Sequence, residues 1–314
     1  MLKFLLTTGF CMLLWAVQAQ QKKLECFTKE WSFTNDNDAY LFQEKDAYYT
    51  NGFFLKLTTA GKEEGNKITR SYEIGQMIYT PLLRKTTGPS DIDRPYCGYL
   101  FLKYHQSQFL KNDGLLQLTA SLGMLGSASY GEDVQNGYHT LLKYARFGGW
   151  QYQVQNAVGI DMGIEYARTV IEDSLWIKLV PVAQMNLGTT FTNAKLGAYL
   201  CIGSFEKNNN SALWNARVQN KATYTRRKYE LFVYWYPQCI FQGYNATVEG
   251  GLFSKGSGAV LGKTAPWMFQ QNLGVCYAQG RWTTKLELVY QSREAVAQIN
   301  THQYGSMELG YRFH

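Results

Sequence analysis

Apolar and polar side chains alternate along much of this chain with a period of two residues. In RWTTKLELVY, residues 281–290, tryptophan, leucine and tyrosine share one face while arginine, lysine and glutamate lie on the other. Residues 115–124 and 156–166 repeat the pattern, with glycine, serine, aspartate or glutamate on the second face. This period predicts β-strands with one apolar side and one polar or small side.

Twelve segments carry this pattern or have the composition of a strand. A β-sandwich has the same period, but its polar face would rarely hold glycine and carboxylates over so many strands. A transmembrane barrel needs this alternation, because it turns one face to lipid and the other to its lumen, and closure removes the sheet edges. We therefore predict an all-β fold, a transmembrane antiparallel β-barrel of twelve strands. The segments are 24–34, 51–60, 70–79, 96–108, 114–124, 155–168, 174–188, 195–205, 228–241, 267–278, 281–292 and 303–313.

A further stretch, 243–253, could form a thirteenth strand, but bacterial single-chain barrels close with even numbers, so we assign it to a loop. The last strand ends in an aromatic residue, Phe313, followed by His314. Since no repeat or linker divides residues 20–314, they are predicted to form one domain.

Composition agrees with this fold and places it outside the cytoplasm. Residues 1–19 have a basic start, a short apolar core and small residues before position 20, which predicts a cleaved secretory signal peptide. The chain contains 23 Tyr, 17 Phe and 8 Trp, an aromatic load typical of outer-membrane barrels. Composition alone also allows a soluble periplasmic β-protein, and the alternation favours the barrel.

Charge and cysteine content exclude several other classes. The formal charge of +7 falls to +6 without Lys3, which suits an anionic lipid surface. The export signal and the lack of a basic cluster at helical spacing argue against nucleic-acid binding. The cysteines of the mature chain are widely spaced and form no CxxC pair, so they predict neither a disulfide framework nor a zinc site.

The order of the strands brings three polar segments to one rim. If the first strand rises from the periplasm, the connections after odd strands lie outside. Those connections include residues 35–50, 80–95 and 125–154. Most inside connections are short, with 206–227 as a long exception.

Two polar clusters in these loops are candidates for chemistry. NDND, residues 35–38, fits either a plain turn or a cation site, because Asn and Asp dominate turns and also offer oxygen ligands. His139 lies in GEDVQNGYH, four residues after Gln135, so a helical turn would place both on one face. A neutral histidine there could take a proton from water or a hydroxyl group.

Three motifs in the first half of the chain resemble the outer-membrane lipid A 3'-O-deacylase family. They are NDND…D..YYTNG, IYTP followed by DRPYCGYLF, and LG.LG……GEDVQNGYH…..GW. They cover most of residues 30–155 in the right order, whereas the second half matches in strand pattern only. One departure is Ser127, which stands where the family usually has proline.

The resemblance implies a function and a set of site residues. It implies removal of the 3'-linked acyloxyacyl chain of lipid A by ester hydrolysis at the extracellular rim, with calcium dependence. The general base would be His139, acting on water or on Thr50, and Ca²⁺ would polarise the ester carbonyl. The residues carried over are Asn35, Asp36, Thr50, Gln135 and His139 for catalysis, Asn35 and Asp36 for the metal, and Arg84 and Lys85 for the substrate phosphate.

Two other functions fit the same features. An outer-membrane phospholipase would also use a histidine and calcium at the outer rim, and a non-enzymatic barrel could be a pore or an adhesin-like structure. We expect the protein to act as a monomer on lipopolysaccharide and other outer-membrane lipids, with its active site at the extracellular face.

Overall fold

The computed structural model describes residues 26–41, 47–61, 65–173, 176–220, 228–254 and 258–314. The predicted signal peptide, residues 1–19, lies outside the described residues. The strands are β1 (Lys29–Asn37), β2 (Tyr48–Ala60), β3 (Ile68–Thr80), β4 (Cys97–Leu110), β5 (Gly114–Leu125), β6 (Ala157–Arg168), β7 (Ile171–Asp173), β8 (Ile177–Gly188), β9 (Phe191–Ser204), β10 (Tyr229–Asn245), β11 (Trp267–Gln279), β12 (Trp282–Gln291) and β13 (His302–Phe313).

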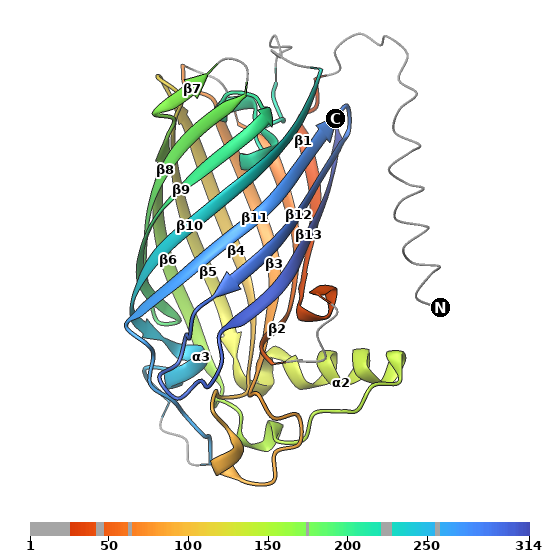
Figure 1. Ribbon diagram of the computed structural model, residues 1–314, viewed down its shortest axis with the longest axis vertical. Helices are drawn as coiled ribbons and strands as arrows, with labels where there is room; N and C mark the ends of the chain where they lie inside the picture. The colour runs from red at the N-terminus through yellow and green to blue at the C-terminus, as the bar shows by residue number, and fades with distance from the viewer. Residues whose placement is uncertain (1–25, 42–46, 62–64, 174–175, 221–227, 255–257) are drawn as a thin grey trace.

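These strands form one closed antiparallel sheet (Figure 1). Strand β1 pairs with β2 and with β13, so the first and last strands are neighbours and the sheet closes. Strand β6 pairs with β8, and the three-residue β7 only extends the edge of β8. Apart from β7, twelve strands close the barrel in the described part of the chain, which confirms the predicted class and number.

The alternation of the sequence explains which face each strand shows to lipid. Along β5, Leu118 and Leu122 are half exposed on the outer surface, whereas the intervening side chains point into the barrel. Strand β6 repeats this with Ile160 and Met162 outside. With no water in the bilayer core, an apolar outer band and a fully paired backbone are what the membrane requires.

The structure departs from the predicted boundaries in places. Strand β1 continues to Asn37, because its backbone stays paired with β2 and β13 through Asn35 and Asp36, so the first outer loop is shorter than predicted. Residues 243–253 form no separate strand: β10 continues to Asn245 and a short helix, α3 (Ala246–Glu249), follows. The third outer loop contains helix α2 (Gly131–Leu142).

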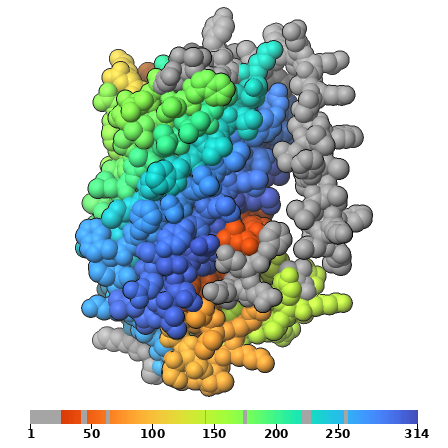
Figure 2. Space-filling model, viewed as in Figure 1, coloured from red at the N-terminus to blue at the C-terminus, as the bar shows by residue number. Residues whose placement is uncertain are grey.

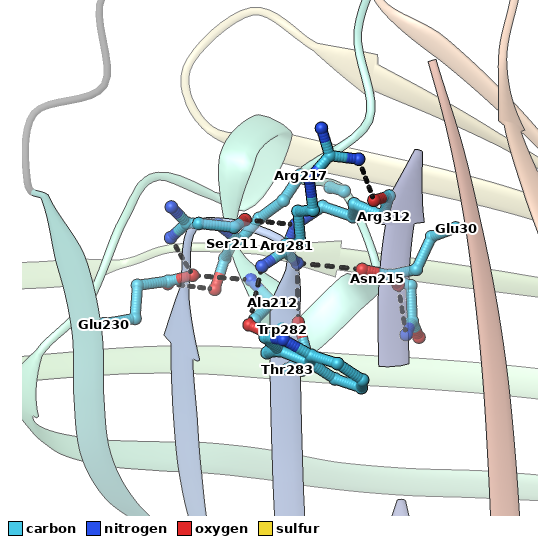
Figure 3. Close-up of polar contacts among 12 residues, drawn as sticks. Glu30, Ser211, Ala212, Asn215, Arg217, Glu230, Arg281, Trp282, Thr283 and Arg312 are labelled. Carbon is cyan, nitrogen blue, oxygen red and sulfur yellow. Dashed lines mark hydrogen bonds and ion pairs between the residues drawn. The ribbon is translucent and has the colours of Figure 1, made fainter. Parts of the chain in front are cut away.

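The long inside connection after β9 folds into the barrel. It contains two short 3-10 turns, η6 (Asn208–Asn210) and η7 (Ala212–Trp214), and Figure 3 shows Ser211, Ala212 and Asn215 among side chains of the lumen. The Asn215 amide donates to Glu30 Oε1 at 3.1 Å and to Glu308 Oε1 at 2.8 Å. This segment therefore fills the periplasmic end of the lumen.

The other end of the barrel carries the loops predicted to lie outside. Helix α2 and the segment after β3 both lie at the end opposite the C-terminus (Figure 1). Figure 2 shows the same two segments gathered at that end. The convergence of the polar loops on one rim is therefore observed.

Candidate active site on the outer wall

Helix α2 packs against the outside of the barrel wall rather than over its mouth. Gly98 of β4 and Gly131 of α2 touch so closely that a Cβ on Gly98 would lie 2.9 Å from the Gly131 Cα. On β3, the Gln76 amide donates to the Ser129 carbonyl at 2.6 Å, just before the helix. Ile78 shares the lipid-facing side with Ile74, yet it is fully covered whereas Ile74 is 47 % exposed. The helix thus shields a patch of wall from the membrane.

Polar residues replace apolar ones on the part of the outer face near α2. On β1, Trp31 and Phe33 are exposed to lipid, whereas Asn35 and Asn37, in the same alternation, are buried. The Asn35 amide donates to the Gly52 carbonyl at 2.9 Å, and the Asn37 amide donates to Asn51 Oδ1 at 2.5 Å. A polar patch at lipid-facing positions is costly unless it serves a purpose, so it marks a candidate site.

Tyr40 connects this patch to the helix. Its hydroxyl donates to Asn35 Oδ1. Burial raises the pKa of the Tyr40 phenol, and the neighbouring Tyr138 and Asp36 raise it further, so it keeps its proton and remains a donor. Tyr138 precedes His139 on α2, and their rings lie 6.5 Å apart. The first loop thus comes within electrostatic range of the helix.

His139 is buried in α2 and held by its own loop. Its Nδ1 lies 2.7 Å from the Ala145 carbonyl oxygen, which can only accept a hydrogen bond. We assign the proton of the neutral ring to Nδ1 for that reason, which makes Nε2 the basic nitrogen. The rings of Tyr144 and Phe147 pack edge-on at 5.9 and 5.4 Å. The imidazole is thus fixed in one tautomer and orientation.

Gln135 lies one turn before His139 on the same helix, which confirms the predicted helical spacing. Its side chain is completely buried, yet within the described residues neither its amide nitrogen nor its amide oxygen has a hydrogen-bond partner. The same holds for Thr80 Oγ1 on β3 and for the Trp150 indole nitrogen. Because buried polar groups are nearly always paired, these atoms point to an absent ligand or water.

The two neighbours in the predicted metal pair face opposite sides of the wall. Asp36 lines a lumenal cavity of about 260 Å³ and accepts a 2.7 Å hydrogen bond from the Tyr49 hydroxyl. Asn35 lies on the outer face, so the two side chains do not share one site. The structure therefore does not bring this predicted pair together, because adjacent residues of a strand point in opposite directions. The other carboxylate of NDND is Asp38, which is buried and accepts from the Ala47 backbone nitrogen at 3.1 Å.

Thr50 occupies an irregularity in the wall. The pairing of β2 with β3 shifts between Tyr49 and Asn51, which leaves Thr50 as the extra residue of a β-bulge. Its side chain is fully buried, and the Asn51 amide lies 3.5 Å from its oxygen. Bulges re-aim side chains beside functional sites, which fits the predicted position of this hydroxyl group.

Of the two predicted basic residues, Arg84 shares an aromatic neighbour with the histidine. The Arg84 guanidinium lies 5.5 Å from the centre of the Phe147 ring, which also packs on His139. Lys85, the next residue, is exposed, and its backbone forms an isolated bridge with Gly148. Arg84 is therefore part of the candidate site and Lys85 lies at its margin.

Several residues of this site were missed by reasoning from the sequence. They are Tyr40, Asn51, Thr80, Tyr138 and Phe147, whereas Asn37 and Asp38 belonged to the predicted NDND cluster without an assigned role. One signal was present: asparagine, glutamine and threonine stand at lipid-facing positions near the ends of the first strands. Tyr138 and Phe147 had no such signal, since the path of the loop alone brings them to the wall.

Calcium binding was predicted at this rim, and the donors fit it only in part. Among the described residues, no group of three or more His, Cys, Asp and Glu side chains could hold a metal ion. Asn35, Asn37 and Asp38 carry oxygens of the kind that calcium prefers. In this structure these side chains accept hydrogen bonds from the Tyr40 hydroxyl, the Ala39 N–H and the Ala47 N–H, respectively. Within the same part of the chain, no helix is long and apolar enough to cross a membrane.

Comparison with known proteins identifies the family. The family model described as outer membrane protein LpxR matches residues 4–313. The solved structure of LpxR from Salmonella typhimurium has a TM-score of 0.74 and 18 % identity, and the match covers 90 % of this chain and all of that one.

Two autotransporter barrels match with much lower scores. The β-domain of the Bordetella autotransporter BrkA reaches a TM-score of 0.44 at 11 % identity, over 92 % of this chain and 99 % of that one. The translocator domain of the autotransporter NalP from Neisseria meningitidis reaches 0.41 at 10 % identity, over 99 % of this chain and 96 % of that one. No curated protein matches the chain. From the family match over nearly its whole length, the chain belongs to the LpxR family of outer membrane proteins, the lipid A 3'-O-deacylases that its motifs resemble.

Proposed function

We propose that this protein hydrolyses the ester that links the 3' acyloxyacyl chain to lipid A, at the outer-wall site beneath α2. One observation carries the proposal. On α2, which packs on the lipid-facing wall, the buried His139 with its Nδ1 bonded to a carbonyl lies one helical turn from Gln135. The Gln135 amide is buried, and within the described residues both of its polar atoms lack a partner. A site in that position meets its substrate within the membrane, which suits a lipid ester better than a soluble one.

The proposed chemistry uses His139 as a general base. Its Nε2 takes a proton from water while the water oxygen attacks the ester carbonyl, and the imidazolium returns that proton to the alcohol oxygen as the ester bond breaks. Gln135 could donate its amide N–H to the developing oxyanion. Thr50 is the alternative nucleophile.

Calcium remains part of the proposal with a revised set of ligands. Asn35, Asn37 and Asp38 would hold the ion on the outer face, whereas Asp36 faces the lumen. When bound, calcium would supply positive charge near the ester carbonyl. Arg84 is placed to contact a phosphate group of the substrate, because a guanidinium matches phosphate geometry.

The two alternatives fare differently. A pore is disfavoured, because residues 205–220 lie in the periplasmic end of the lumen, where Asn215 bonds to Glu30 and Arg217 pairs with Glu230. A phospholipase would use the same kind of site, and the substrate decides between the two.

Mass spectrometry of lipid A tests the proposal. Detergent-solubilised protein with Ca²⁺ should remove one acyloxyacyl mass, whereas His139→Ala should lower the rate by about a thousandfold, within the range of general-base catalysis. Chelation with EDTA should also stop the reaction. His105→Ala, a change in β4 on the lumenal face, is the matched control. Intact lipid A together with cleaved phospholipid would replace this proposal with the phospholipase function.

A further inference from the structure

An apolar groove of about 640 Å³ runs along the outer wall over strands β1 to β5. Its walls are mostly aliphatic and aromatic side chains, including Trp31, Leu55, Tyr72, Ile74 and Leu102. These residues lie at the lipid-facing positions of their strands and are between 43 and 60 % exposed.

The groove lies on the same strands as the site beneath α2. Along β3, Tyr72 and Ile74 line the groove, whereas Ile78, further along the same face, is covered by a cluster that includes Phe147 and Trp150 of the loop after α2. Along β4, Leu102 lines the groove and Gly98 touches the start of α2. One continuous stretch of outer wall therefore connects the groove to the candidate site.

An aromatic pair bounds the groove at the end far from the site. The rings of Tyr72 and Tyr104, which are direct partners on β3 and β4, lie 5.4 Å apart. Tyr72 stands six residues before Ile78, about 20 Å along the strand. With the usual strand tilt of about 40°, this is a depth of roughly 15 Å, or about one leaflet of hydrocarbon.

One small residue opens the groove on its β5 side. Ala120 lies on the outer face between Leu118 and Leu122 and pairs with Tyr104 and Met162 on the neighbouring strands. Its four neighbours are all large, so the single methyl group leaves a hollow. A larger side chain here would reduce the groove without touching α2.

We propose that this groove binds one acyl chain of the lipid substrate, and that the Tyr72–Tyr104 pair limits the chain length that fits. The inference rests on the proposed ester hydrolysis beneath α2. Bulky aliphatic walls suit a hydrocarbon chain, whereas a partner helix in a membrane packs best on small residues and polar side chains. Since chains in bulk lipid are already in hydrocarbon, the groove acts by aligning the ester, not by adding hydrophobic affinity.

Competition between a long-chain and a short-chain lipid A ester tests the role in selection. Ala120→Trp should lower the ratio of long-chain to short-chain hydrolysis about tenfold, because a misplaced chain shifts the ester from its reactive position. Ala183→Trp is the control, since Ala183 is equally lipid-facing but lies on β8. An unchanged ratio in active Ala120→Trp protein would show that the groove holds only annular lipid, and would overturn the proposal.

Photocrosslinking tests occupancy without relying on hydrolysis. A photoreactive phenylalanine analogue in place of Leu102, a large residue that already lines the groove, should capture lipid A in preference to phospholipid from mixed micelles, whereas the same analogue in place of Leu187 on β8 should show no preference. Selective capture without hydrolysis would retain the groove and refute the proposed ester chemistry. Equal capture at both positions would refute the groove.

Discussion

Two polar regions of this barrel differ in how well their side chains are paired. In the periplasmic half of the lumen, the Arg312 guanidinium lies 2.8 Å from Glu30 and also donates to Thr283 and the Trp282 carbonyl (Figure 3). On the outer wall beneath α2, Gln135 has both amide atoms unpartnered within the described residues.

The comparison separates stability from function. The lumenal network is closed on itself: Arg217 pairs with Glu230 at 3.0 Å, and Lys285 pairs with Glu308 at 3.2 Å. Such a network holds residues 205–220, the connection after β9, in place and pairs its charged side chains with one another. The outer-wall site beneath α2 keeps buried donors and acceptors unpaired, on Gln135, Thr80 and Trp150. This lowers the stability of the fold, as expected of a binding or catalytic site.

The largest expected effect comes from breaking the lumenal network. Glu30→Gln removes the charge facing Arg312, both of which are about 1 % exposed. We expect the free energy of unfolding to fall by about 3 kcal/mol, because a buried charge is left uncompensated. Unfolding in guanidinium, followed by tryptophan fluorescence, measures this.

The control for that change is Glu132→Gln, at the exposed start of α2, which should cost less than about 1 kcal/mol. The hydrolytic rate per folded molecule should stay near that of the parent protein in Glu30→Gln. A large loss of rate with unchanged stability would contradict the division of roles between the two regions.

Substitution at the outer-wall site beneath α2 should have the opposite effects on stability and rate. Gln135→Leu removes an unpartnered buried amide, so unfolding stability should rise or stay level, since such an amide costs about 1–3 kcal/mol. The rate of deacylation should fall about a hundredfold if the amide stabilises the oxyanion. Parallel unfolding curves and rate measurements check both signs, and a destabilised Gln135→Leu would show that the amide is structural.

The two Asn-Asp pairs, residues 35–36 and 37–38, allow the lumenal and outer sides to be compared at the end of one strand. Asp38→Asn should lower activity about tenfold and weaken its response to calcium, because it removes the carboxylate proposed to hold the ion. Asp36→Asn should change the rate less than about twofold, since its side chain lies in the lumen with Tyr49. Calcium titrations of the two variants measure this, and the reverse order would restore Asp36 as the ligand.

The smallest difference is expected between the two basic neighbours after β3. Arg84→Ala should raise KM for lipid A about fivefold through loss of one phosphate contact, whereas Lys85→Ala should stay within about twofold. Rates on substrate that lacks the phosphate should erase the difference. Equal effects in both variants would indicate a general surface charge effect instead.

The fold was predictable because the pattern that the membrane imposes on each strand can be recognised from neighbouring residues alone. Each strand must show apolar side chains to lipid at every second residue, so residues 281–290 or 156–166 reveal their structure without knowledge of their neighbours. The helical spacing of Gln135 and His139 was readable in the same way. In the sequence, the segment after β9 that folds into the lumen was recognisable only as an unusually long connection. Its partners Glu30 and Glu308 lie far away in the sequence.

The sequence alone determined that this is an exported twelve-stranded barrel with Gln135 and His139 on one helical turn, since alternation and helical spacing depend on near neighbours. It could not choose between the two Asn-Asp pairs of NDND, because the choice depends on how far β1 stays paired with β2 and β13. The tertiary structure decided that Asp36 enters the lumen, that Asp38 accepts a hydrogen bond from the Ala47 backbone, and that α2 lies on the wall. Those outcomes depend on contacts such as Gly98 with Gly131, which packing creates and no local pattern encodes.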